Sequence, residues 1–139
     1  MHHHEQVTIH PATREAIKVD KNLKEVILSL NDYEFYTTNS CIDNFGKMWI
    51  EFERYDYSLK LMQSALTYHM NHINNRDSLY FFLQERGTFT LNFVNEVVTD
   101  PQNADNVMST GNVEEYVSLR IDNNYFFTFK RLLLQVFPN

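Results

Sequence analysis

The 139-residue chain has few of the residues that break or cross-link a fold, with one cysteine, three glycines and three prolines. A single cysteine cannot form an intrachain disulfide, which fits a reducing compartment, so we predict a cytoplasmic protein. No apolar run approaches the about 18 residues of a membrane-spanning helix, and no signal-peptide core follows the N-terminus. The sequence therefore predicts neither membrane insertion nor export.

Basic residues are also scarce, with 12 Lys and Arg against 18 Asp and Glu and a net charge of −6. No basic cluster is present, so broad nucleic-acid binding is not expected, whereas a basic partner stays open. Glycine-rich phosphate loops and the HExxH and GxSxG motifs are absent from the sequence. We assign no catalytic residue, and the sequence favours a non-enzyme without deciding the question.

What the chain does have is enough apolar material for a core, with 43% hydrophobic and 14% aromatic residues. Its length is typical of one domain. Residues 1–5 contain three consecutive histidines and are taken as a tag-like or disordered N-terminus, with their native origin left open. Residues 6–139 are predicted to form a single domain.

Helical periodicity predicts three helices. The first begins after Asp20 as its N-cap and the last after Asp122, while the second spans residues 58–73. The expected buried stripes are Leu23, Val26, Ile27 and Leu30 in the first, Leu59, Met62, Leu66, His69 or Met70, and Ile73 in the second, and Phe126, Phe129, Leu133 and Val136 in the third.

Alternating patterns predict strands at residues 7–9, 34–38, 47–53, 89–93 and 116–121. The second and third of these are predicted to form a hairpin with a wide loop at residues 39–46. Residues 79–85 are assigned to a hairpin strand before Gly87, with continuation of a helix as the alternative. Residues 99–112 have little apolar content and are predicted to be a long binding loop, lid or disordered segment. The fold class is therefore α+β, with two or three helices packed on one face of a mainly antiparallel sheet.

The segment TTNSC is the main candidate for a binding site. Its residues, Thr37, Thr38, Asn39, Ser40 and Cys41, supply hydroxyl, amide and thiol groups at a predicted strand end, which suit a phosphate, carboxylate or ribose. The alternative is a polar turn in which Cys41 packs as a small apolar residue. A nucleophilic Cys41 would need a neighbouring base or cation, and none is near it in sequence.

A second candidate is an aromatic and cationic patch formed by Trp49, Tyr116 and Arg120 if their strands are neighbours. Such a patch suits a nucleotide or an acidic peptide, while a homodimer interface or a solvated face is the alternative. His69 and His72 lie one helical turn apart without further ligands, so no metal site is predicted. No cofactor is assigned.

The layout VDKNLKEVILSLNDYEFYTTNSC followed by GKMWIEFE resembles a group of small uncharacterised bacterial and phage proteins, and VSLRID with the terminal helix resembles their closing strand and helix. This resemblance implies a fold. FYTTNSC also resembles the TTSSCSGR strand and loop of the wybutosine-synthesis methyltransferases, with Asn39 in place of a serine. In that family the loop helps to bind S-adenosylmethionine and tRNA.

Three functions follow from these observations. The leading hypothesis is a small cytoplasmic binding module that binds a small molecule, a nucleotide or a protein partner, and we expect it to be a homodimer. The alternatives are an S-adenosylmethionine-dependent RNA-modifying enzyme, implied by the second resemblance, and an acidic phage-type inhibitor or adaptor protein.

Overall fold

The computed structural model describes residues 5–42, 46–73, 77–100 and 102–139. Within them the chain forms a four-stranded antiparallel sheet, a two-stranded sheet and four α-helices, which confirms the α+β prediction. The elements in chain order are β1 (Gln6–Ile9), β2 (Ile17–Asp20), the 3₁₀ turn η1 (Lys21–Leu23), α1 (Lys24–Asp32), β3 (Thr37–Ile42), β4 (Lys47–Phe52), α2 (Asp56–Asn71), α3 (Leu79–Arg86), β5 (Gly87–Asp100), β6 (Asn103–Asp122), the 3₁₀ turn η2 (Asn123–Tyr125) and α4 (Phe126–Val136).

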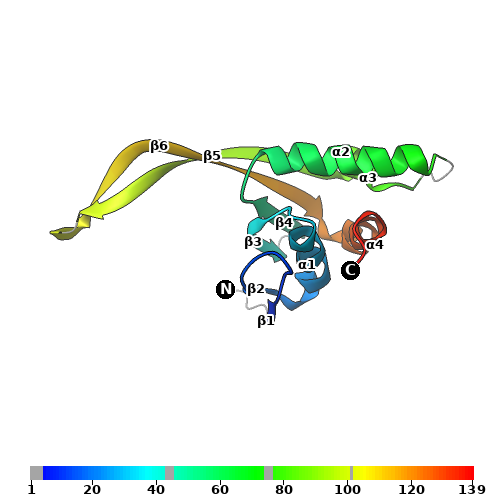
Figure 1. Cartoon of the computed structure of the whole chain (residues 1–139), viewed down its shortest axis with the longest axis horizontal. Helices are drawn as coiled ribbons and strands as arrows, with labels where there is room; N and C mark the ends of the chain where they lie inside the picture. The colour runs from blue at the N-terminus through cyan, green and yellow to red at the C-terminus, as the bar shows by residue number, and fades with distance from the viewer. Residues whose placement is uncertain (1–4, 43–45, 74–76, 101) are drawn as a thin grey trace.

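The larger sheet has the strand order β3-β4-β6-β5, and its last two strands are far longer than the others. β4 pairs with β6 only from Asp122 to Val117, whereas β5 continues to pair with β6 as far as Asn103. The outer part of the β5–β6 hairpin therefore projects from the body as a two-stranded ribbon (Figure 1). We call residues 92–116 of this hairpin the arm.

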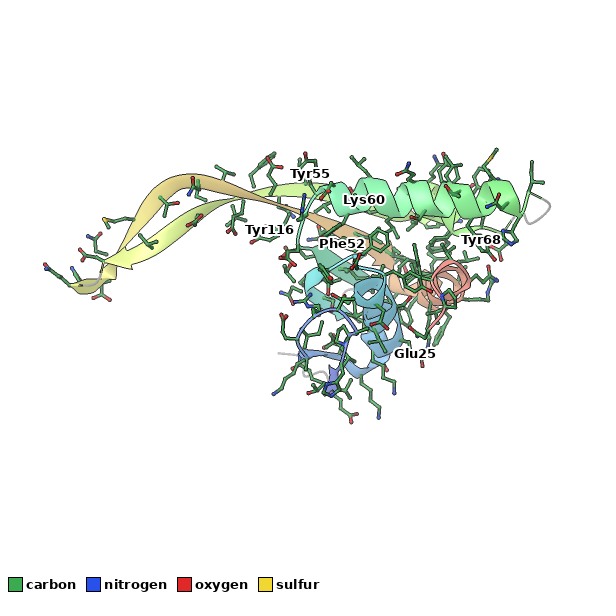
Figure 2. The ribbon with its side chains drawn as sticks, viewed as in Figure 1. Glu25, Phe52, Tyr55, Lys60, Tyr68 and Tyr116 are labelled. Carbon is green, nitrogen blue, oxygen red and sulfur yellow. The ribbon has the colours of Figure 1, made fainter. Side chains whose placement is uncertain are left out.

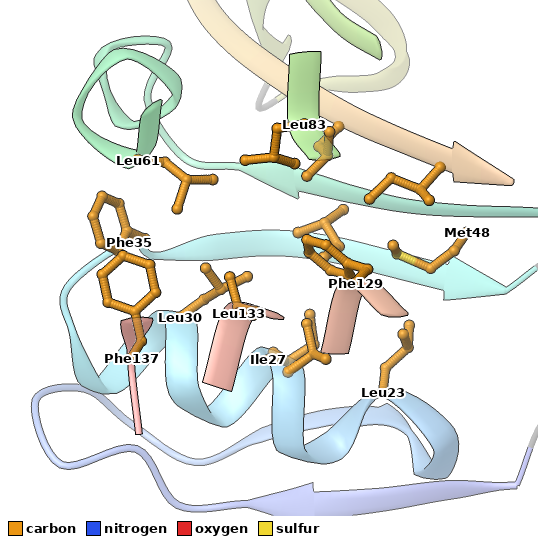
Figure 3. Close-up of a cluster of buried hydrophobic side chains, with 14 of the residues drawn as sticks. Leu23, Ile27, Leu30, Phe35, Met48, Leu61, Leu83, Phe129, Leu133 and Phe137 are labelled. Atoms are coloured by element: carbon orange, nitrogen blue, oxygen red, sulfur yellow. The ribbon is translucent and has the colours of Figure 1, made fainter. Parts of the chain in front are cut away.

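One hydrophobic core joins the sheet to all four α-helices (Figure 3). The sheet contributes alternate residues of β4 and β6, as their sequence patterns predict, and α1 and α4 contribute their predicted stripes. The fully buried members include Met48, Ile50, Phe52 and Leu119 from the strands, Leu23, Ile27 and Leu30 from η1 and α1, Leu61 from α2, and Phe129 and Leu133 from α4. Because the inward strand residues belong to this cluster, the helices cover one face of the sheet.

A polar network holds the N-terminal segment against α1 and β3. Asn31 is fully buried, and its amide donates to Ile27 O at 2.7 Å and to Thr37 Oγ1 at 3.1 Å. Its Oδ1 accepts from Thr37 N at 3.2 Å and from the Arg14 guanidinium at 2.9 Å. Because burial without partners is costly for each of these groups, Asn31 fixes where three segments meet.

The hairpin strand predicted at residues 79–85 is wrong, and this segment is the helix α3. Ser78 caps the helix by accepting from Phe81 N, and Leu79, Phe82 and Leu83 are buried at the spacing of a helix. Phe81, which the strand prediction places with Leu79 and Leu83, is exposed instead. The apolar run fits either period, and packing against the core selects the helix.

The long loop predicted at residues 99–112 is also wrong, because this segment lies within the arm. Asp100 pairs with Asn103, and Val98 pairs with Met108 across the ribbon. The backbone hydrogen bonds of an antiparallel ladder do not depend on apolar side chains. A polar sequence can therefore extend as a ribbon in solvent, which the low apolar content did not reveal.

The helix α2 buries a different face from the predicted one. Its fully or almost fully buried residues are Leu61 and Ala65, whereas Leu59, Leu66, Met70 and Ile73 are exposed. The helix therefore has two apolar sides, and the regular stripe that the periodicity reveals is the outer one.

The two predicted caps have different outcomes. Asp122 caps the turn before α4, with its Oδ1 accepting from Asn124 N at 2.9 Å, as predicted. Asp20 makes no side-chain cap and ends β2, a strand that the sequence did not indicate, where its carboxylate accepts from Ile42 N at 3.3 Å. The predicted edge strand at residues 7–9 is observed as β1.

Candidate functional site

The TTNSC segment is a strand rather than a loop, so the predicted loop at residues 39–42 is wrong. It forms β3 and pairs with β4, with a register shift between Thr37 and Asn39. Part of the remaining predicted loop, residues 43–45, lies outside the described residues. Pairing with β4 satisfies the backbone of the segment, which favours the strand over a free turn.

The strand divides the predicted site residues between two faces. Thr37 and Ser40 pair with the inward residues Phe52 and Ile50, whereas Cys41 pairs with the outward Trp49. Asn39 shares the outward face. Because alternate residues of a strand point to opposite sides, these side chains do not converge on one ligand.

The two threonine hydroxyls already have partners within the protein. Thr37 is buried, and its Oγ1 accepts from Asn31 Nδ2 at 3.1 Å. Thr38 Oγ1 donates to Glu51 Oε1 at 2.7 Å. These contacts give both hydroxyls a structural role.

The second predicted patch has the expected geometry on the outward face of the sheet. Trp49 on β4 pairs directly with Arg120 on β6, so the two strands are neighbours as the hypothesis required. Cys41 flanks Trp49 on the other side, and Thr88 flanks Arg120. The result is one row of side chains across four strands, with Trp49 half-buried and Arg120 exposed.

Tyr116 lies four residues before Arg120, at the root of the arm (Figure 2). Its hydroxyl donates to a carboxylate oxygen of Glu114. This hydrogen bond, together with a little burial and the negative charges of Glu114, Glu51 and Glu53, raises the pKa of the Tyr116 phenol. The acidic surroundings of Tyr116 favour a cationic neighbour over an anionic ligand there.

Arg120 and Tyr116 of the second predicted patch line two different open cavities. Arg120 lines one of about 470 Å³ together with Lys47, Arg86, Glu85 and Asp122. Thr38 and Tyr116 line another, of about 550 Å³, with Arg14 and Glu53 among the other residues. The predicted ligand-binding set is therefore spread over more than one surface region.

A third cavity, of about 420 Å³, lies between the start of α1 and the start of α4. Its lining combines the aliphatic and aromatic side chains of Ile42, Phe126 and Phe127 with Lys21, Lys24 and Lys130. Lys130 forms an ion pair with Glu25 at 2.7 Å, so part of its positive charge is already compensated. No motif in the sequence identified this cavity, because its residues come from segments about a hundred positions apart.

The described part of the chain contains no group of three or more His, Cys, Asp and Glu side chains placed to hold a metal ion. Among the same residues, no helix has both the length and the apolar character needed to cross a membrane.

The arm contains the segment 99–112, which the sequence predicted as a binding loop, a lid or a disordered segment. Among its described side chains none is buried, and Phe93 is 64% exposed. The other large exposed apolar residues on or beside it are Leu91, Val94, Val98, Met108 and Val113. Phe93 and Val94 are consecutive residues of β5, so their side chains point to opposite sides and both faces of the arm carry apolar side chains.

The arm also carries nearly all of the net charge. Residues 87–119 contain five acidic residues, Glu96, Asp100, Asp105, Glu114 and Glu115, and no Lys, Arg or His. The remaining 13 acidic residues almost balance the 12 basic residues. This one-signed segment was visible in the sequence, but its position on a projecting ribbon was not.

No protein-family model, curated protein or solved structure matches the chain. The resemblances noted in its sequence therefore stay predictions.

Proposed function

We propose that the protein is a protein-binding module whose arm is the binding element. The observation that carries this proposal is the exposure of Phe93, Val94, Val98, Met108 and Val113 on a ribbon that projects from the body (Figure 1). An isolated two-stranded ribbon is at best marginally stable in water, and clustered exposed apolar side chains are typical of interaction sites.

The chemistry of the arm favours a protein over a small ligand. A ribbon presents convex apolar side chains, whereas small molecules are bound in concave sites that surround them. The carboxylates of Glu96, Glu114 and Glu115 lie among the apolar side chains, as charged residues do at the rim of a protein interface. An exposed apolar surface with no excess of negative charge is the complementary partner.

Site-specific photo-cross-linking in intact cells tests this function. A photo-reactive benzoylphenylalanine in place of Phe93 is expected to form covalent adducts with protein, and mass spectrometry then identifies the partner. Phe127 is the matched control, because it is a phenylalanine of the body that is 79% exposed. We expect strong adducts at Phe93 and weak ones at Phe127.

Equal yields at the two positions would show only that exposed aromatic residues collide with cellular proteins. That result, or the absence of protein adducts at Phe93, contradicts the proposed function.

A further inference from the structure

The outer side of α2 is a second exposed apolar surface. Leu59, Leu66 and Ile73 are spaced seven residues apart, with Met70 beside them, and Ile73 lies in the turn after the helix. Leu59 and Ile73 are 66% and 68% exposed. A seven-residue apolar repeat is the pattern of a helix surface that packs against another element. We call these four residues the α2 stripe.

The arm and α2 extend from the body in opposite directions (Figure 1). Figure 2 shows Tyr55 and Tyr116 close to the point from which they diverge. Within one chain the arm therefore cannot fold back onto the α2 stripe without breaking its pairing at the root. Both surfaces stay open to another molecule.

The two surfaces match in length. The 16 residues of α2 span about 24 Å at the rise of an α-helix. The strand from Asn92 to Asp100 spans about 30 Å at the rise of a β-strand. An arm laid along α2 of another copy thus covers the whole stripe.

Symmetry then closes the arrangement. A two-fold axis that crosses the longest dimension of the molecule near its middle turns the second copy end to end relative to the first. The arm of each copy then runs along α2 of the other copy. Such a pairing makes two equivalent contacts, in which each arm and each α2 stripe is used once, as in closed two-fold dimers.

The charge of the arm favours contact with α2 over contact with a second arm. Pairing two arms brings five carboxylates of one copy against five of the other, with no basic residue on either. The helix α2 contains Asp56 and Lys60 as its Asp, Glu, Lys or Arg residues, and they form an ion pair at 3.5 Å. An arm therefore meets no net negative charge along α2.

We propose that the partner of the arm is α2 of a second copy of this chain, so that two copies exchange arms about a two-fold axis. This inference rests on the proposed function, because it assigns an occupant to the arm. A pairing of α2 with α2 would cover the stripe but leave both arms exposed.

Disulfide trapping with purified protein tests the contact, in a Cys41→Ser background. One protein carries Val98→Cys in the arm, and the other carries Leu66→Cys in the α2 stripe. After mixing and mild oxidation, we expect a cross-linked dimer in the mixture and little in either protein alone. Lys18→Cys, at an exposed position of β2, is the matched control and should cross-link with neither protein.

To test the register of the arm along α2, the mixture is repeated with Val94→Cys in place of Val98→Cys and with Leu59→Cys in place of Leu66→Cys. Two arm variants and two α2 variants give four pairings. A cross-link formed by Leu66→Cys alone shows α2 packed on α2 and overturns the proposed contact. So does the absence of cross-links from all four pairings together with a monomer mass in analytical ultracentrifugation.

A complementation experiment gives an independent readout. One variant replaces residues 93–115 with Asn-Gly, and the other carries Leu59→Glu and Ile73→Glu. Each alone is expected to be monomeric, whereas their mixture should form a heterodimer through the one intact arm and the one intact stripe, with a Kd at least tenfold weaker than that of the unmodified protein. Phe127→Glu, on α4, should leave the dimer unchanged.

If the unmodified protein is dimeric but the two variants do not associate when mixed, the proposed exchange of arms is wrong. If the purified protein is monomeric but Phe93 cross-links to a different protein in cells, the inference fails and the proposed function stands. If both experiments fail, both proposals are wrong.

Discussion

At the scale of single residues, the protein is held together by a few buried polar contacts that join distant segments. Asn31 bonds to α1, β3 and the N-terminal segment at once. Ser29 is likewise fully buried, and its hydroxyl donates to Phe137 O, which ties the C-terminal end to α1. Such residues do not stand out in a hydrophobic pattern, because they interrupt it.

Asn31→Ala is expected to lower the free energy of unfolding by about 3 kcal/mol, since it leaves Thr37 N and the Arg14 guanidinium without their buried acceptor. Urea denaturation followed by circular dichroism measures this change. Asn39→Ala, at an exposed position of β3, is the control, with an expected change of about 0.5 kcal/mol or less. Equal losses in the two variants would show that the network around Asn31 adds no stability.

The ion pair between Glu25 and Lys130 makes a pH-dependent contribution to the free energy of unfolding. The Lys130 ammonium, by hydrogen bonding and by its charge, lowers the pKa of Glu25 below its ordinary 4.5. A carboxyl group whose pKa is lowered in the folded state stabilises the fold above its unfolded pKa and loses that effect as the pH falls through the folded pKa. The contribution is fully present at pH 7 and shrinks as the pH falls below 4.5.

Glu25→Gln should therefore cost at most about 1 kcal/mol at pH 7, because both side chains are partly exposed, and less at pH 3. Urea denaturation at the two pH values measures the difference. Lys130→Gln should produce a loss of the same size at pH 7, and the double variant should lose no more than either single one. A constant difference from pH 7 to pH 3 would contradict the ion-pair origin.

At the scale of elements, the body does not need the arm in order to fold. None of its described side chains is buried, and none belongs to the core cluster. Its root is different, because Val117, Leu119 and Ile121 are buried and a Cβ on Gly87 would lie 2.8 Å from Leu83 O. The body therefore ends where β4 stops pairing with β6.

Replacing residues 93–115 with Asn-Gly is expected to keep the body folded, because the two-residue turn closes the hairpin at the Asn92–Tyr116 pair. Measured at low concentration, where association does not contribute, the Tm should change by no more than about 4 °C. Circular dichroism and thermal denaturation provide the readout. A loss of cooperative unfolding would show that the arm is part of the folding unit.

At the scale of the whole molecule, the chain consists of a nearly neutral body and an acidic arm. The net charge of −6 is therefore not spread over the surface but concentrated on one projecting element. Together with the α2 stripe at the other end, this distribution gives the molecule two different apolar surfaces along its longest dimension. Association through them adds stability that depends on protein concentration, while the fold of the body does not.

The candidate site was less accessible to sequence analysis than the fold. The strand patterns placed Trp49 and Arg120 on outward faces, but a shared patch depended on their strands being neighbours, which the structure shows. The convergence of Thr37, Ser40 and Cys41 does not occur, because a strand sends successive side chains to opposite faces. Treating the segment as a loop concealed that constraint.

The sequence by itself determined the α+β class, the inward residues of β4 and β6 and the buried faces of α1 and α4, because their periodicity records one-sided burial. It also contained the seven-residue repeat of α2 and the one-signed charge of residues 87–119. Only the tertiary structure decided that the α2 stripe faces outward and that residues 99–112 belong to a projecting ribbon. A periodic pattern shows that a face is apolar, but what covers that face depends on where the rest of the chain packs.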